Sequence, residues 1–195
     1  MASVIMVEMG ETGLTRASDA RLQVCGLGAC VGLCLYETHL RLAVLVHIVL
    51  PHTLPPILGR SRAALPPLPG KSADTAVVHA LAEIERQGGR REQTYAAIVG
   101  GAQIFTGGDR NTEAPSRLEI GQRNVYAVKE ELSRLGIPLC AEDTGGHFGR
   151  TVTLDANTGA VSVRPVGLAE RSLIVLGRSV RQNSPVLEGV LAYGN

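Results

Sequence analysis

Residues 25–50 open with Cys25-Gly26-Leu27-Gly28-Ala29-Cys30 and continue into two apolar runs, Val31-Gly32-Leu33-Cys34-Leu35-Tyr36 and Leu42-Ala43-Val44-Leu45-Val46-His47-Ile48-Val49-Leu50. Both runs have the length and composition of buried β-strands. The segment between them, residues 37–41, is short and polar, as a hairpin loop is. Antiparallel pairing brings the start of the first run beside the end of the second. Cys30 would then lie close to His47, and a thiol beside an imidazole is what a cysteine nucleophile requires.

The rest of the chain predicts further strands and two helices. We interpret residues 1–20 as a short apolar start followed by a polar loop, and residues 22–36 as one strand. Apolar residues at helical spacing predict a helix from Ser72 to about residue 87 and a second one up to Leu135, in which Glu130 and Arg134 have the spacing of an i,i+4 ion pair. Strand composition recurs at 96–101, 137–141, 151–154 and 160–163. Hairpins that alternate with single helices favour an α/β fold of layered mixed β-sheets flanked by helices.

A proline-rich segment, Pro51–Gly70, follows the second apolar run directly. Its prolines exclude a regular helix and a central strand. Because it leaves the strand that carries His47, we expect it to form a wall or lid beside any site there.

Composition limits the class of protein. The chain has 195 residues, 45% of them hydrophobic, which is enough for one domain with a real core. A formal net charge of +1 gives no strong field toward nucleic acid or anionic lipid, so neither is an expected partner. The N-terminus lacks a secretory signal, and the longest apolar run is far shorter than the roughly 20 residues of a membrane helix. We therefore expect a cytoplasmic protein without membrane insertion, with its four cysteines reduced.

Three patterns that would suggest a cofactor or a metal are incomplete. Gly26-Leu27-Gly28 lacks the third glycine of a dinucleotide motif, because Val31 takes its place. Gly70-Lys71-Ser72 resembles the end of a phosphate-binding loop, but Leu65 stands where that loop has its first glycine. The spacing of cysteines 25, 30 and 34 does not exclude zinc, yet alternation along a strand turns the first away from the other two. We expect no cofactor and no metal, with a zinc site as the weaker alternative.

Cys30 and His47 each have a purely structural interpretation as well. A single cysteine is usually a small buried apolar residue, and a histidine within a buried strand is usually a core residue. Cys30, however, follows a glycine turn, which can expose its sulfur and leave nearby backbone N–H groups free for an oxyanion. Four other histidines compete for the role of base, and they are His39, His52, His79 and His147.

Several motifs recur in a known order along the chain. They are Leu27-Gly28-Ala29-Cys30, His47-Ile48-Val49-Leu50-Pro51, Lys71-Ser72-Ala73-Asp74, Gly100-Gly101-Ala102, Ile120-Gly121-Gln122-Arg123-Asn124-Val125, and Asp143-Thr144-Gly145-Gly146 with Gly149-Arg150. In order and spacing, over roughly residues 20–165, they resemble the chemoreceptor glutamine deamidase family, CheD. We accordingly divide the chain into a deamidase-like domain, 1–164, and a C-terminal extension, 165–195, whose role the sequence does not indicate.

The resemblance implies a fold shared with the deamidase domain of cytotoxic necrotizing factor toxins. It also implies a catalytic pair, Cys30 and His47, that converts receptor glutamines to glutamate through a thioester and releases ammonia in chemotaxis adaptation. The implied partners are chemoreceptor cytoplasmic domains and a CheC-type phosphatase. We assign Gly28 and Ala29 to the oxyanion site and Thr144 to the lining of the pocket.

One position departs from the pattern of the family. Family members commonly have Ser or Thr where this chain has Val24, so we expect reduced activity. The alternative function is a binding module, without turnover, that docks a CheC-type phosphatase or a receptor.

Overall fold

The computed structural model describes residues 3–16, 19–53, 68–103 and 117–178, without the side chains of 117–119. These residues form two five-stranded sheets, an outer sheet in the order β1-β3-β8-β9-β10 and a central sheet in the order β2-β5-β4-β6-β7. The helical segments are η1 (Pro69–Lys71), α1 (Ala73–Arg86), η2 (Arg91–Gln93) and α2 (Arg117–Arg134). The strands are β1 (Ser3–Met6), β2 (Thr12–Arg16), β3 (Ala20–Leu27), β4 (Val31–Glu37), β5 (Leu42–Ile48), β6 (Thr94–Gly100), β7 (Leu139–Thr144), β8 (Arg150–Asp155), β9 (Ala160–Pro165) and β10 (Arg171–Val175).

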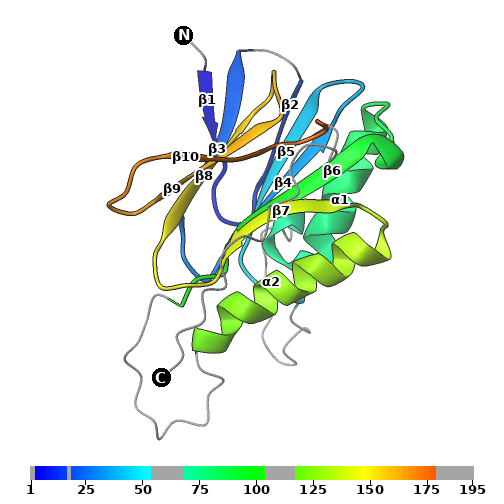
Figure 1. Ribbon diagram of the computed structural model, residues 1–195. Coiled ribbons are helices and arrows are strands. Elements are labelled where there is room, and N and C mark those ends of the chain that lie inside the picture. The colour runs from blue at the N-terminus through cyan, green and yellow to red at the C-terminus, as the bar shows by residue number, and fades with distance from the viewer. Residues whose placement is uncertain (1–2, 17–18, 54–67, 104–116, 179–195) are drawn as a thin grey trace, which may run out of the picture.

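The elements stack in three layers, with the central sheet between the outer sheet and the two α-helices (Figure 1). One hydrophobic core fills the space between the central sheet and the helices and includes Leu33 and Ile84. A second core lies between the two sheets and includes Leu45 and Val152. The prediction of a layered α/β fold with mixed sheets is therefore confirmed.

Strands β4 and β5 form the predicted hairpin in the middle of the central sheet. Their register pairs Gly32 with His47 and Cys34 with Leu45. Every residue of both strands is buried. Because the helices cover one face and the outer sheet covers the other, these strands are apolar on both faces, with Glu37 and His47 as their buried polar residues.

The expectation of a single strand over residues 22–36 is wrong. β3 ends at Leu27 in the outer sheet, and β4 begins at Val31 in the central sheet. The register of β3 with β8 shifts between Val24 and Leu27, and Gly26 has a positive φ of 71°. This β-bulge and the turn after it carry the chain from one sheet to the other. Cys30 lies where the chain enters the central sheet.

Both predicted helices are confirmed, and α2 begins at Arg117 and ends at Arg134. The apolar face of α2, with Val128 and Leu132, packs into the core beneath the central sheet. The predicted ion pair between Glu130 and Arg134 is wrong, because Arg134 binds Glu131 at 2.6 Å. Residues three and four apart are both neighbours on a helix, so spacing alone does not select the partner.

The two ends of the chain add strands that the sequence patterns do not predict. Residues 1–20 were interpreted as a short apolar start and a polar loop, but they hold two strands: β1 pairs with β3, and β2 pairs with β5. Both are short edge strands, and the residues of β1 are all exposed, so no alternation marks it. β10 pairs with β9, so the described part of residues 165–195 adds an edge strand to the outer sheet. Most of the expected proline-rich wall, residues 54–67, lies outside the described residues.

Three further facts bear on the class of protein. Within the described ranges, none of the helices is long and apolar enough to cross a membrane. The cysteines at 25, 30, 34 and 140 are free thiols. The same part of the chain contains no cluster of three or more His, Cys, Asp or Glu residues that could hold a metal ion.

Candidate active site

Cys30 and His47 lie on the same face of the central sheet, at the same end of the hairpin. Val31 pairs with Ile48, so Cys30 comes opposite Val49 and diagonal to His47. Diagonal neighbours on antiparallel strands are roughly 7–8 Å apart, within reach of long side chains. Their shared face looks into the core between the two sheets, against which Cys30 packs. The register thus brings the predicted nucleophile and the predicted base to one site.

The backbone carbonyls of the two residues before Cys30 accept hydrogen bonds that fix this segment in place. The carbonyl of Gly28 accepts a hydrogen bond from the Ala102 N–H at 2.7 Å. The carbonyl of Ala29 accepts one from Nδ2 of Asn124 at 2.8 Å. In a planar trans peptide the N–H points opposite to the C=O, so the N–H groups of Ala29 and Cys30 point away from these partners. Both N–H groups therefore have no protein acceptor within the described part of the chain.

A glycine turn, Gly100-Gly101, packs against this segment. Its φ angles are 118° and 63°, in the region that favours glycine. The Gly101 N–H donates to the Cys30 carbonyl at 2.8 Å. A Cβ added to Gly100 would lie 2.2 Å from that carbonyl oxygen, and a Cβ on Gly101 would lie 2.3 Å from a methyl group of Val125. The close approach to the Cys30 carbonyl therefore requires glycine at position 100.

We expect Gly100→Ala to destabilise the protein by about 2 kcal/mol or more, because it adds a clash with the backbone to the cost of the positive φ. Gly88→Ala is the matched control, since Gly88 has a φ of 87° but open space around it. The free energy of unfolding of Gly88→Ala should fall only by the cost of placing alanine at a positive φ, about 1 kcal/mol. Urea unfolding of the two variants measures the difference. Equal losses of unfolding free energy in the two variants would contradict the clash, because they would mean that the backbone of Cys30 moves away from the added methyl group at no energetic cost.

The loop Gly145–Gly149 follows β7 and is shaped by one buried arginine. Arg150 is 8% exposed and donates from Nη1 to the carbonyls of Gly145 and Phe148, at 2.8 and 3.0 Å. Its Nε donates to Asp143 at 3.1 Å. Asp143 also binds Arg171 of β10 at 2.5 Å. Charge-assisted hydrogen bonds of this kind are short and strong, so they fix the loop where the two sheets meet.

The same loop contacts the glycine turn, and Thr144 precedes it. The Gly145 N–H donates to the Gly100 carbonyl at 2.9 Å. Thr144 pairs with Gly100 at the end of β7, so it lies at the same edge of the sheet as Cys30. It shares its face of the strand with Glu142, which binds Lys129 of α2 at 2.6 Å. The structure therefore places Thr144 on the helix side of the central sheet, whereas Cys30 and His47 face the outer sheet.

His47 is deeply buried, close to the backbone of Val7 and the charge of Glu8. It is 5% exposed, and neither ring nitrogen has a hydrogen-bond partner among the described residues. Burial lowers the pKa of His47 below its ordinary value, and the backbone of Val7 and the charge of Glu8 oppose this effect. Burial raises the pKa of the Cys30 thiol. Both shifts favour an uncharged thiol and an uncharged imidazole at neutral pH. The uncharged imidazole is the form that can accept a proton.

Val24 stands where the resemblance places Ser or Thr. It is fully buried in β3 and projects into the core between the sheets, the layer that His47 also faces. β3 packs against β5, which carries the histidine. A valine side chain offers no hydrogen bond, in agreement with the unpartnered imidazole.

The other four histidines lie in different surroundings. His39 is in the loop at the far end of the hairpin, and His79 is on α1, beyond the helix face of the central sheet. His52 and His147 are exposed at the end of the molecule that holds Cys30. The Nδ1 atom of His147 is 3.2 Å from the carbonyl of Gln103. Among these side chains, His47 is the one whose strand register puts it on the face of Cys30.

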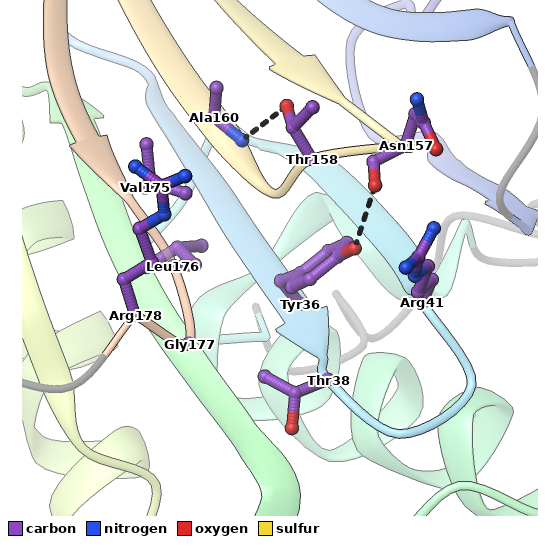
Figure 2. Close-up of a pocket in the computed structure, with 10 residues that line it drawn as sticks. All are labelled: Tyr36, Thr38, Arg41, Asn157, Thr158, Ala160, Val175, Leu176, Gly177 and Arg178. Carbon is purple, nitrogen blue, oxygen red and sulfur yellow. Dashed lines mark hydrogen bonds between the residues drawn. The ribbon is translucent and has the colours of Figure 1, made fainter.

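A cleft of about 610 Å³ lies at the other end of β4, about 20 Å from Cys30 along the strand. Figure 2 shows Tyr36 between Arg41 and the segment from Val175 to Arg178, with its hydroxyl donating to the Asn157 carbonyl at 3.5 Å. Neither Cys30 nor His47 lines this cleft. The cleft and the candidate active site are separate.

Similarity to known proteins decides the family. A family profile described as CheD chemotactic sensory transduction matches residues 53–165. A probable chemoreceptor glutamine deamidase CheD of Moorella thermoacetica is 42% identical over 163 residues, which cover 84% of this chain and 91% of the relative. The chain belongs to the CheD family. The family resemblance read from the motifs is therefore confirmed.

Other CheD relatives align over similar lengths. Proteins of the same name from Symbiobacterium thermophilum and Geobacillus kaustophilus are 41% and 40% identical, over 86% and 84% of this chain and 95% and 93% of their own length. A solved structure of a hypothetical protein, YfiH of Bacillus licheniformis, covers 75% of this chain and 59% of its own at 15% identity and a TM-score of 0.36. A likeness that slight carries no argument about function.

The sequence patterns did not assign a role to two side chains that shape the CheD site. Asn124 was quoted only within a motif, and the structure shows that it donates to the carbonyl of Ala29, next to Cys30. Arg150 was quoted only as part of a motif. The sequence did carry a signal for Asn124, because it is a polar residue on the apolar face of α2, four positions before Val128.

Proposed function

We propose that this CheD-family chain is a protein-glutamine deamidase of chemoreceptors, with Cys30 as the nucleophile and His47 as the general base. The observation that supports this most directly is the hairpin register, which sets the thiol and the imidazole on one face and at one end of β4 and β5. The relatives at about 40% identity carry the name chemoreceptor glutamine deamidase.

In the first half of the reaction, neutral His47 takes the proton from the Cys30 thiol as the sulfur attacks the carboxamide carbon of a glutamine side chain. The negative charge that develops on the carboxamide oxygen is stabilised by the N–H groups of Ala29 and Cys30, which point away from the clamped carbonyls. The imidazolium then gives its proton to the departing nitrogen, which leaves as ammonia. The product on the enzyme is a glutamyl thioester.

In the second half, His47 takes a proton from a water molecule as its oxygen attacks the thioester carbonyl. The same two N–H groups stabilise the second oxyanion. The C–S bond breaks, the thiol regains its proton from His47, and the receptor keeps a glutamate. One water is consumed and one ammonia is released, and no step calls for a metal or an organic cofactor.

Partial exposure of the nucleophile agrees with a side chain presented by another protein. Ala29 and Cys30 are half-buried instead of lying at the bottom of a deep cleft. We propose chemoreceptor cytoplasmic domains as the substrate and a CheC-type phosphatase as a further partner. The proposal places the reaction in chemotaxis adaptation, in the cytoplasm.

One experiment separates this function from the alternative of a binding module. A chemoreceptor cytoplasmic fragment is incubated with the protein, and ammonia release and glutamine-to-glutamate conversion are followed, the latter by mass spectrometry. We expect conversion. Binding of the fragment without conversion would favour the module, the function that Val24 and the unpartnered His47 support.

We expect Val24→Thr to raise kcat by up to about tenfold, the value of one added hydrogen bond to the imidazole. Threonine has nearly the shape of valine, so packing changes little. Val152→Thr is the matched control, because Val152 pairs with Val24 and is buried in the same core. It adds the same hydroxyl on the neighbouring strand and should give no gain. A large loss of activity in Val24→Thr alone would mean that His47 is oriented in another way.

A further inference from the structure

Asn124 connects the loop of the nucleophile to the strand of the base. It lies on α2 and is fully buried. Its Nδ2 donates to the carbonyl of Ala29 at 2.8 Å and to the carbonyl of Val49 at 3.0 Å. Ala29 precedes Cys30 directly, and Val49 follows β5 just beyond His47. One amide group therefore spans the two segments that hold the proposed catalytic pair.

The two carbonyl contacts also fix how the amide of Asn124 is oriented. Both neighbours are acceptors, so the NH2 group, which has two donors, must face them. The Oδ1 atom then points elsewhere, and it is buried without a hydrogen-bond partner among the described residues. The apolar face of α2 is otherwise built from aliphatic residues such as Val128 and Leu132. An asparagine at this position satisfies two carbonyls but leaves its own acceptor unpaired.

The Ala29 carbonyl belongs to the same peptide group as the Cys30 N–H. Because that peptide is planar and trans, a carbonyl held toward α2 turns the N–H away from the helix layer. We propose that Asn124 is a positioning residue that aims the Cys30 N–H at the substrate oxyanion. This inference rests on the proposed deamidase function and adds to it the device that orients the oxyanion site. The Ala102 N–H does the same for the Ala29 N–H through the Gly28 carbonyl.

The test compares Asn124→Leu with wild type and with two controls on the same helix. Leucine has a similar shape but donates no hydrogen bond. Val128→Ala removes buried volume from α2 without touching the loop of Cys30, and Gln122→Ala changes an exposed position. The full-length proteins are assayed on a chemoreceptor cytoplasmic fragment for kcat and KM. Their thiols are also treated with methyl methanethiosulfonate, which modifies Cys30 without forming an oxyanion.

For Asn124→Leu we expect kcat to fall by about tenfold or more, with KM within about twofold, because an oxyanion contact forms only in the transition state. Methanethiosulfonate labelling of Cys30, located by fragment mass spectrometry, should change by less than about threefold. Val128→Ala and Gln122→Ala should keep the wild-type kcat. Asn124→Ser, with a smaller disturbance of packing, serves if the leucine variant does not fold.

Two results would overturn the positioning role while leaving the deamidase intact. One is an unchanged kcat in both Asn124 variants, or a loss no greater than that of Val128→Ala at equal thermal stability. The other is a raised KM with unchanged kcat, which would make Asn124 a binding contact. If the wild type itself converts no glutamine, the proposed function fails, and the positioning role fails with it.

Discussion

Replacing Cys30 by alanine is expected to lower the rate of glutamine conversion by at least about 10⁴-fold, to a level indistinguishable from the uncatalysed reaction. Every covalent step of the proposed reaction uses this sulfur, and no other thiol has its surroundings. Cys34 is fully buried, and burial raises its pKa to about 12. The variant should fold, because alanine removes one partly exposed sulfur and leaves the hydrogen bonds to the backbone carbonyls of residues 28–30 in place. Ammonia release from a receptor fragment measures the loss.

Cys25→Ala is the matched control for that result. Cys25 is exposed and lies just before the same loop, with its sulfur 3.6 Å from the side-chain oxygen of Gln23. It should retain activity within about twofold, as surface substitutions usually do. Conversion that persists in Cys30→Ala and disappears in Cys25→Ala would move the nucleophile to the other cysteine.

The central hairpin could be predicted because two signals coincided there. Two continuous apolar runs with a short polar connection leave antiparallel pairing as the simplest arrangement. The side-chain period of two then puts residues 30, 32 and 34 on one face of the sheet. The exact register, in which Gly32 pairs with His47, is given by the structure, because antiparallel pairing alone allows several registers.

The division of residues 22–36 between two sheets could not be predicted in the same way. Apolar composition continues across the turn, since Leu27 and Val31 are both fully buried. The breaks are a bulge and a glycine with positive φ, and neither interrupts a hydrophobic pattern. Gly26 and Gly28 were the signals, and they were read as a turn before Cys30, without the change of sheet.

The supports of the site also depend on tertiary contacts that no local pattern records. Asn124 reaches Ala29 from a helix far along the chain, and Arg150 holds carbonyls of the loop that precedes it. Local spacing marked both as parts of motifs. The roles of Asn124 and Arg150 become visible only in the folded chain, where α2 packs against β4 and β6, and β7 lies beside β6.

His47→Gln is expected to lower kcat by about 10²–10⁴-fold, the usual range for a lost general base. Glutamine fits the buried site without a charge but cannot take a proton from Cys30. The wild-type rate should fall as the pH drops through the pKa of His47, which burial sets below the ordinary 6.5. The residual rate of His47→Gln should not show this fall at acid pH. A wild-type profile without an acid limb, or a variant that keeps it, would assign the base to another residue.

Stability against pH checks the same histidine independently of any substrate. The pKa of His47 is lower in the folded state than the 6.5 of an ordinary histidine, so below that pH the unfolded chain binds a proton that the folded chain does not. The free energy of unfolding should therefore decline as the pH falls below about 6.5 and through the lowered pKa of the folded state. The contributions of Asp155 and Glu83, whose pKa values are lowered, are lost only at more acidic pH. In His47→Gln the decline over that window should be smaller, as measured by urea unfolding at each pH. An equal decline in both proteins would mean that the buried imidazole takes up its proton without unfolding, which would place it in contact with an acceptor and change the starting state of the proposed mechanism.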